Sequence, residues 1–73
     1  MSRYIICYDI PCDRRCVRVA KLLDGYGARV QKSVFEADLD SLMAEQMKSE
    51  LRDELDLLED KILIYVLCGA CMP

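Results

Sequence analysis

Residues 4–23, YIICYDIPCDRRCVRVAKLL, decide the fold, because they pass from a strand pattern to a helix pattern. Residues 4–8 are too few for a helix and are rich in β-branched and aromatic side chains, which predicts a central strand. We expect this strand to end at Asp9, since Pro11 breaks the ladder of backbone hydrogen bonds. A helix follows, with Asp13 as its N-cap. Its apolar stripe, at helical spacing, consists of Cys16, Val19, Ala20, Leu23 and Tyr26.

The middle of the chain predicts extended structure between two helices. Gly25 and Gly27 are expected to end the first helix, because glycine adopts the left-handed conformation at low cost. Residues 28–39 read as one long strand or as two short strands. That segment contains no glycine or proline, so a hairpin there would turn at Ser33 or within residues 36–38.

A second helix and a last strand complete the pattern. Asp40 or Ser41 caps the helix, and the apolar run at residues 61–67 predicts a strand. The stripe assigned to the core-facing side of the helix consists of Leu39, Leu42, Met43, Met47, Leu51, Leu55 and Leu58. This order predicts one α+β domain over residues 1–73, a ferredoxin-like β-α-β-β-α-β sandwich with two helices on one face of an antiparallel sheet.

The small size and apolar composition of the chain predict self-association. A chain of 73 residues buries only about 60% of the surface that it exposes when unfolded, yet 53% of its residues are hydrophobic. Helices on one face leave the other face of the sheet bare. We therefore expect a homodimer formed through the sheet side.

Compartment and cysteine usage can be judged from the same composition. No apolar run approaches the roughly 20 residues of a membrane-spanning helix, and the N-terminus has no signal-peptide layout. We expect a cytoplasmic protein with reduced thiols and no membrane partner. Cys12-x3-Cys16 and Cys68-x2-Cys71 could together supply the four thiolates of a zinc site, but the first spacing suits one helical turn and the second lies at the chain end.

Charge is divided unevenly along the chain. Residues 1–36 carry seven Lys/Arg and four Asp/Glu, a net of +3, whereas residues 37–73 carry three and nine, a net of −6. The overall −3 argues mildly against a nucleic-acid partner, but one half could present a basic face. A symmetric dimer would double that face.

The residues restrict the chemistry of phosphodiester cleavage. The chain has no histidine, which excludes imidazole acid–base catalysis and Ser-His-Asp or Cys-His sites. Cleavage would need a water activated by a divalent metal ion. Asp9, at the end of the first strand, is the one well-placed carboxylate, and a symmetry axis could bring a second Asp9 to the same ion. A turn residue that stops the strand is the other interpretation of Asp9.

Arginines and aromatic residues are the candidates for nucleic-acid contacts. Arg14, Arg15, Arg18 and Arg29 could hold phosphate groups, or the helical arginines could form a solvated face with salt bridges. Tyr8 and Phe35 could stack on bases, although packing in the core is the commoner use of such rings and is preferred for Phe35.

Two stretches resemble one known family. Residues 8–23 contain a strand that ends in Tyr-Asp-Ile-Pro and an arginine-bearing helix, and residues 25–36 read GYGARVQKSVFE. Together with the late Ile-Tyr-x-Leu-Cys strand, they resemble the CRISPR-associated Cas2 family. The chain departs from many members at Cys12, where they carry an acidic residue, and at Cys16, where they carry an arginine. We also expect it to lack the further C-terminal strand of the family.

The resemblance implies both partners and a site. It implies a ferredoxin-like homodimer that joins CRISPR integrase subunits and binds duplex DNA during spacer acquisition. Some members are described as metal-dependent endonucleases on single-stranded RNA or on DNA. By that resemblance Asp9 is the catalytic and metal-binding residue, with Mg²⁺ or another divalent ion shared by two copies. Arg18 and Arg29 match nucleic-acid-binding arginines, Arg15 could replace the one missing at Cys16, and Tyr8 and Phe35 match supporting aromatics.

Two other functions stay open at this point. One is a stand-alone metal-dependent ribonuclease of toxin or defence type, and the other is a non-catalytic ferredoxin-like interaction domain.

Overall fold

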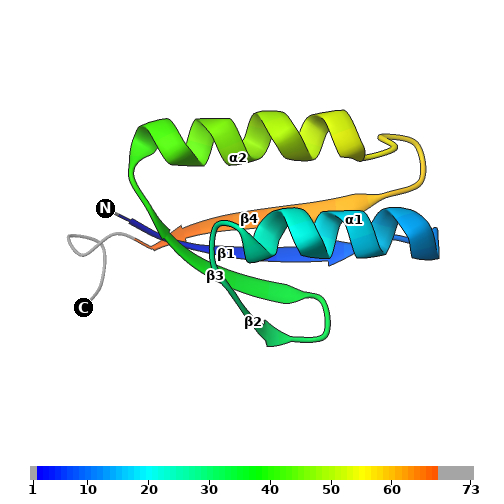
Figure 1. The fold of residues 1–73 in the computed structure, drawn as a ribbon, viewed down its shortest axis with the longest axis horizontal. Coiled ribbons are helices and arrows are strands. Elements are labelled where there is room, and N and C mark those ends of the chain that lie inside the picture. Colours follow the sequence, from blue (N-terminus) through cyan, green and yellow to red (C-terminus); the bar gives the residue numbers. More distant parts are fainter. Residues whose placement is uncertain (1, 68–73) are drawn as a thin grey trace.

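A computed structural model describes residues 2–67 of the protein. It contains two helices and four strands in the predicted β-α-β-β-α-β order (Figure 1). The elements are β1 (Ser2–Asp9), α1 (Asp13–Asp24), β2 (Ala28–Gln31), β3 (Val34–Leu39), α2 (Ser41–Glu54) and β4 (Lys61–Leu67). The strands at residues 4–9 and 61–67 are confirmed.

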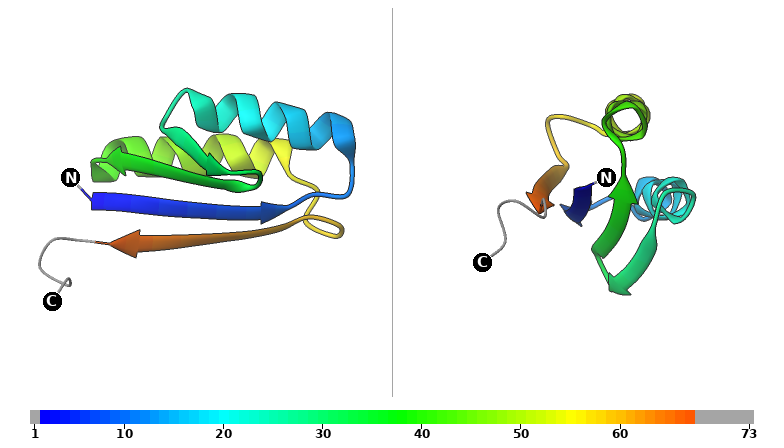
Figure 2. Two further views of the ribbon diagram at one scale, coloured as in Figure 1. Left: turned by 90° about the horizontal axis from the view of Figure 1, so that it is seen from below. Right: turned by 90° about the vertical axis from the view of Figure 1, so that its left-hand side faces the viewer.

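The four strands form one antiparallel sheet in the order β2-β3-β1-β4. The first strand is therefore central, and Ile6 lies opposite Phe35 on one side and Ile64 on the other. Both helices cover the same face, as the end-on view in Figure 2 shows. This arrangement confirms the ferredoxin-like sandwich.

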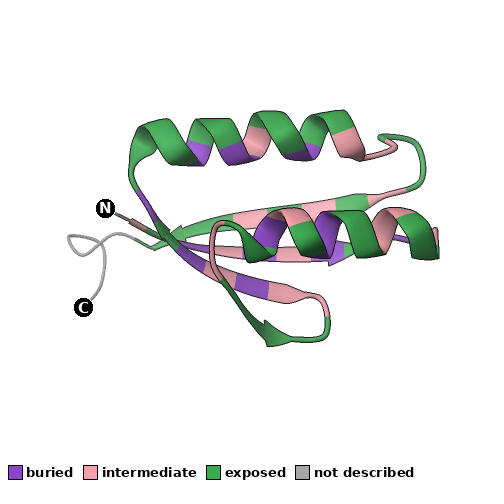
Figure 3. Ribbon diagram, in the orientation of Figure 1, coloured by how far each residue is buried: buried purple, intermediate pink, exposed green. Residues whose placement is uncertain are grey.

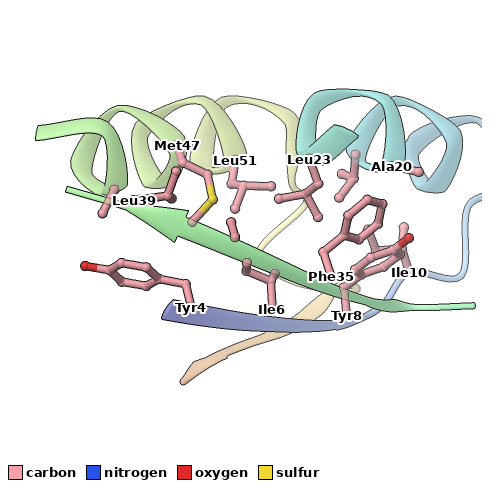
Figure 4. Packing of buried hydrophobic residues seen from close by; sticks show 13 residues of the cluster. Tyr4, Ile6, Tyr8, Ile10, Ala20, Leu23, Phe35, Leu39, Met47 and Leu51 are labelled. Atoms are coloured by element: carbon pink, nitrogen blue, oxygen red, sulfur yellow. The ribbon is translucent and has the colours of Figure 1, made fainter. Parts of the chain in front are cut away.

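The core lies between that face and the helices (Figure 3). Side chains alternate along a strand, so every second residue of β1 and β3 points toward the helices. The thirteen buried hydrophobic residues are Tyr4, Ile6, Tyr8, Ile10, Val19, Ala20, Leu23, Phe35, Ala37, Leu39, Ala44, Met47 and Leu51 (Figure 4). Cys16 and Tyr26 pack against this cluster, which confirms the stripe predicted for α1.

The beginning of α1 differs from the prediction. Cys12 is the N-cap, with φ −82° and ψ 117°, and its side chain makes no capping hydrogen bond. Its carbonyl oxygen accepts the first hydrogen bond of the helix, from the Cys16 amide at 2.9 Å. Asp13 therefore lies in the first turn, where its charge interacts favourably with the helix dipole. In α2 the prediction holds, because Asp40 accepts a hydrogen bond from the Met43 amide at 2.8 Å.

The two glycines after α1 do not adopt the predicted left-handed conformation. Gly25 has φ −72° and ψ −15°, because its amide closes a tight turn onto the Leu22 carbonyl. Gly27 is required for a different reason. A Cβ atom on Gly27 would lie 2.1 Å from the backbone oxygen of Glu36, so only glycine allows the chain to approach β3 this closely.

Residues 28–39 form two strands, which decides the alternative left open by the sequence. β2 and β3 pair as a hairpin that turns at Lys32 and Ser33. The register shifts between Arg29 and Gln31, which marks a bulge in the edge strand β2.

The apolar stripe assigned to α2 is only partly correct. The helix buries Ala44, Met47 and Leu51, whereas Leu42 is 78% exposed and Leu58 is 97% exposed. Each helical residue turns by about 100°, so Leu42 lies on the opposite side of the helix from Ala44. Leu58 follows the end of the helix at Glu54 and lies in the loop before β4.

Candidate functional site

Asp9 is the last residue of the central strand and is exposed. Tyr4, Ile6 and Tyr8 point toward the helices, so alternation places Asp9 on the open face of the sheet with Ile5 and Cys7. Within residues 2–67 its carboxylate takes part in no hydrogen bond or ion pair. The carboxylate is therefore available to a ligand.

A cavity of about 350 Å³ opens beside Asp9. It is lined by Tyr8, Asp9, Ile10, Asp13, Cys16, Lys32 and Ser33. Asp9 and Asp13 give it two carboxylates, while the described part of the chain contains no cluster of three or more potential metal ligands. One chain thus offers a pair of hard oxygen donors at most, and any further ligands must come from outside it. Cys68 and Cys71, the other half of the considered zinc site, lie outside the described residues.

Tyr8 and Phe35 form an aromatic stack inside the core, where Figure 4 shows their rings next to each other. The ring centroids are 6.1 Å apart, and Tyr8 and Phe35 are 6% and 0% exposed. The preferred core role of Phe35 is confirmed. Burial at this depth leaves neither ring free to stack on a base.

The hydroxyl of Tyr8 is buried without a hydrogen-bond partner among the described residues. Burial raises the pKa of this phenol, and the nearby charge of Arg29 opposes that effect. The phenol therefore stays protonated at neutral pH.

Arg29 joins this stack from the edge strand. Its guanidinium carbon lies 5.4 Å from the centroid of the Phe35 ring, a cation–π contact. Arg29 is exposed and makes no ion pair with the rest of the described chain, as is also true of Arg18 on α1. The donor groups of both side chains are thus free.

Arg15 makes a different contact. Its Nε lies 2.6 Å from Asp60 Oδ2 and its Nη2 lies 2.8 Å from Asp60 Oδ1, with Glu59 Oε2 at 3.2 Å from the same nitrogen. The hydrogen bond from Arg15 lowers the pKa of Asp60, and the bond to Asp60 raises the pKa of Arg15. Asp60 directly precedes β4, whereas Arg29 lies on β2 at the opposite edge of the sheet. The structure therefore separates Arg15 from Arg29.

Lys61 is a residue that the sequence interpretation missed. It is exposed and lies directly opposite Asp9 in the β1–β4 ladder. Only the register of β4 brings these two residues together, and no local signal in the sequence gives that register.

The open face of the sheet is apolar at its centre. Leu63, Tyr65 and Leu67 are 58%, 53% and 41% exposed, and Leu63 and Tyr65 lie opposite Cys7 and Ile5. Directly opposite residues share a face, so these side chains form one patch that also reaches Val34, the partner of Cys7 on β3. The predicted bare apolar face is present. No helix in the described chain is long and apolar enough to cross a membrane.

These features define the class: a small ferredoxin-like domain with an uncovered sheet face and a free acidic residue at the end of its first strand. The sequence model described as CRISPR associated protein Cas2 matches residues 1–72. The chain belongs to the CRISPR-associated Cas2 family.

Individual relatives agree with this assignment. The CRISPR-associated endoribonuclease Cas2 4 of Rhodospirillum rubrum is 46% identical over 71 residues, which are 97% of this chain and 57% of the relative. The chain thus spans little more than half the length of that relative. A crystal structure of a hypothetical protein from Thermus thermophilus is 46% identical, with a TM-score of 0.89, and the match covers 93% of this chain and 83% of the other. A chain from a partial Cas6-RT-Cas1–Cas2 complex is 30% identical, with a TM-score of 0.83 and coverage of 94% and 81%.

Proposed function

We propose that two copies of this chain pair through their open sheet faces and bind nucleic acid as part of a CRISPR adaptation complex with an integrase subunit. The observation that carries the proposal is the unpaired carboxylate of Asp9 at the rim of an exposed apolar sheet face. The similarity to a chain from a Cas1–Cas2 complex supports an integrase partner.

The dimer follows from the apolar patch. A soluble chain that leaves Leu63, Tyr65 and Leu67 exposed on one face gains free energy when a second copy covers them. A two-fold axis near the Asp9 end of β1 would bring the two Asp9 carboxylates together. Two adjacent carboxylates repel each other, and a shared cation removes that repulsion.

The donor set suits a hard divalent cation. Mg²⁺ is typically held by one or two carboxylates and completes its shell with water and phosphate oxygens. Asp9 from each copy would hold the ion, and Asp13 lines the same cavity. When bound, such an ion supplies Lewis-acid assistance to attack of water on a phosphodiester. The protein itself would position the phosphate and keep Asp9 free of competing partners.

Arg18 and Arg29 would contact the phosphate backbone. The Phe35 ring holds Arg29 at the face of its guanidinium, so the N–H groups along the edge remain available for two phosphate oxygens. Contacts of this kind are independent of sequence and weaken steeply with salt. Tyr8 and Phe35 support the site by holding Arg29 rather than by touching bases.

The binding function is tested by gel shift. The full chain, its integrase partner and spacer-length duplex DNA should form a ternary complex that Arg18→Ala combined with Arg29→Ala weakens strongly. Lys48→Ala on α2 is the matched control and should not change the complex. Absence of any ternary complex with the wild-type chain would refute the proposal.

Metal-dependent cleavage is a second candidate function, favoured by the name of the Rhodospirillum rubrum relative. The chain without its integrase partner should then cut single-stranded RNA or duplex DNA in Mg²⁺, and Asp9→Asn should abolish cutting. Asp53→Asn, an exposed carboxylate on α2, serves as the control. Cutting that survives Asp9→Asn at the wild-type rate would exclude Asp9 as a catalytic residue.

A further inference from the structure

Arg15 and Asp60 form the most strongly buried ion pair in the described chain. Their side chains are 19% and 1% exposed, and two parallel N–H···O bonds join them at 2.6 and 2.8 Å. Bidentate geometry is the strongest form of an arginine–carboxylate pair. It fixes the first turn of α1 to the residue directly before β4.

Asp60 also organises the loop that it ends. Its Oδ2 accepts a hydrogen bond from the Asp56 amide at 2.9 Å, and its own amide donates to the Asp56 carbonyl at 2.8 Å. Asp56 Oδ1 in turn accepts from the Leu58 amide at 2.9 Å. The loop between α2 and β4 is thus closed on itself and tied to α1, so the start of β4 is held in place.

The residue that this arrangement positions is Lys61. It begins β4 and lies directly opposite Asp9 in the ladder. Directly opposite residues of an antiparallel pair have Cβ atoms about 5 Å apart on one face of the sheet. Lys61 is exposed, and its ammonium makes no ion pair within residues 2–67. An unpaired cation therefore stands beside the unpaired carboxylate of Asp9.

We propose that Lys61 is a phosphate-binding residue of the Asp9 site and that Arg15 and Asp60 are its positioning pair. This inference rests on the proposed function and extends it to a residue on β4. An ammonium group is a compact charge that binds a non-bridging phosphate oxygen, while the adjacent Asp9 is left for the divalent ion. Arg15, predicted from the sequence as a phosphate contact, acts instead through Asp60 and Lys61.

The phosphate contact is tested with the full chain and a fluorescent duplex DNA or single-stranded RNA of fixed length. Lys61→Met keeps the length of the side chain and removes its charge, and it should weaken binding about tenfold, the effect of one charge-assisted contact. It should also reduce the dependence of log K on log salt by about one to two contacts per dimer. Lys61→Arg should retain affinity, and Lys48→Met on α2 should match wild type. Wild-type affinity and salt slope in Lys61→Met would overturn the proposal.

The positioning role is tested by combining substitutions. Asp60→Asn should weaken binding, and Lys61→Met should add little when Asp60 is already changed, because both remove the same contact. Additive losses would show that Asp60 does not act through Lys61. Arg15→Lys provides a milder variant if Asp60→Asn unfolds, and far-ultraviolet circular dichroism verifies the fold of each.

Failure of this inference and failure of the proposed function are distinguishable. Wild-type protein that binds no nucleic acid refutes both. Wild-type binding that depends on Arg18 and Arg29 but not on Lys61 refutes only the role of Lys61.

Discussion

Replacing Leu63 by alanine tests whether the open sheet face is the surface through which two copies pair. Full burial of a leucine side chain contributes roughly 1.5–3 kcal/mol. Leu63 is 58% exposed in the single chain, so covering it in a dimer contributes about 1 kcal/mol for each copy. The symmetric interface contains the residue twice. Leu63→Ala should therefore weaken dimerisation by about 2 kcal/mol, or about 30-fold in Kd.

Sedimentation equilibrium over a range of concentrations measures this Kd directly. Leu42→Ala is the matched control, because Leu42 is 78% exposed but lies on the outer side of α2 rather than on the sheet. The stability of the single chain should hardly change in either variant, since neither side chain belongs to the buried core. Equal dimer affinities of the two variants would refute the assignment of the interface, as would a wild-type protein that remains monomeric.

Three further predictions concern stability. Gly27→Ala should destabilise the fold by several kcal/mol, about what a backbone clash costs, because its Cβ would lie 2.1 Å from the Glu36 oxygen; thermal unfolding measures the loss, and an unchanged Tm would contradict it. Asp40→Ala should cost about 1 kcal/mol through loss of the N-cap, measured by urea unfolding against Asp53→Ala. Asp60 has its pKa lowered below 3.8 by the hydrogen bond from Arg15, so its contribution is complete above that pH and is lost as the pH falls through the lowered pKa. Asp60→Asn should therefore lower stability at pH 7 and flatten its decline in acid, and an identical acid limb would contradict this.

The strands and helices were predictable because their signals are local. The apolar run at residues 61–67 and the stripe around Val19 and Leu23 specify elements without reference to the rest of the chain. The ends of elements were less predictable, since they depend on neighbours. Gly27 is fixed by its contact with β3 rather than by a left-handed turn.

The site was predictable only in part, for the same physical reason. Asp9 stands out because it follows a strong strand signal. The roles of Arg15 and Lys61 depend on contacts with residues about 45 and 52 positions away in the sequence. On an isolated helix Arg15 appears as solvent-exposed as Arg18, and only the buried Asp60 distinguishes them. Such pairings are decided by strand register, which a single sequence does not reveal.

The central claim is that two copies meet so that their Asp9 carboxylates share one divalent cation at the rim of the paired sheet faces. A crystal structure of the full chain grown with Mn²⁺ and recorded at the manganese absorption edge tests it most directly. The account predicts one anomalous peak on the two-fold axis, held by Asp9 of both copies. A dimer that leaves the two Asp9 residues on opposite outer surfaces, with no peak between them, would contradict it.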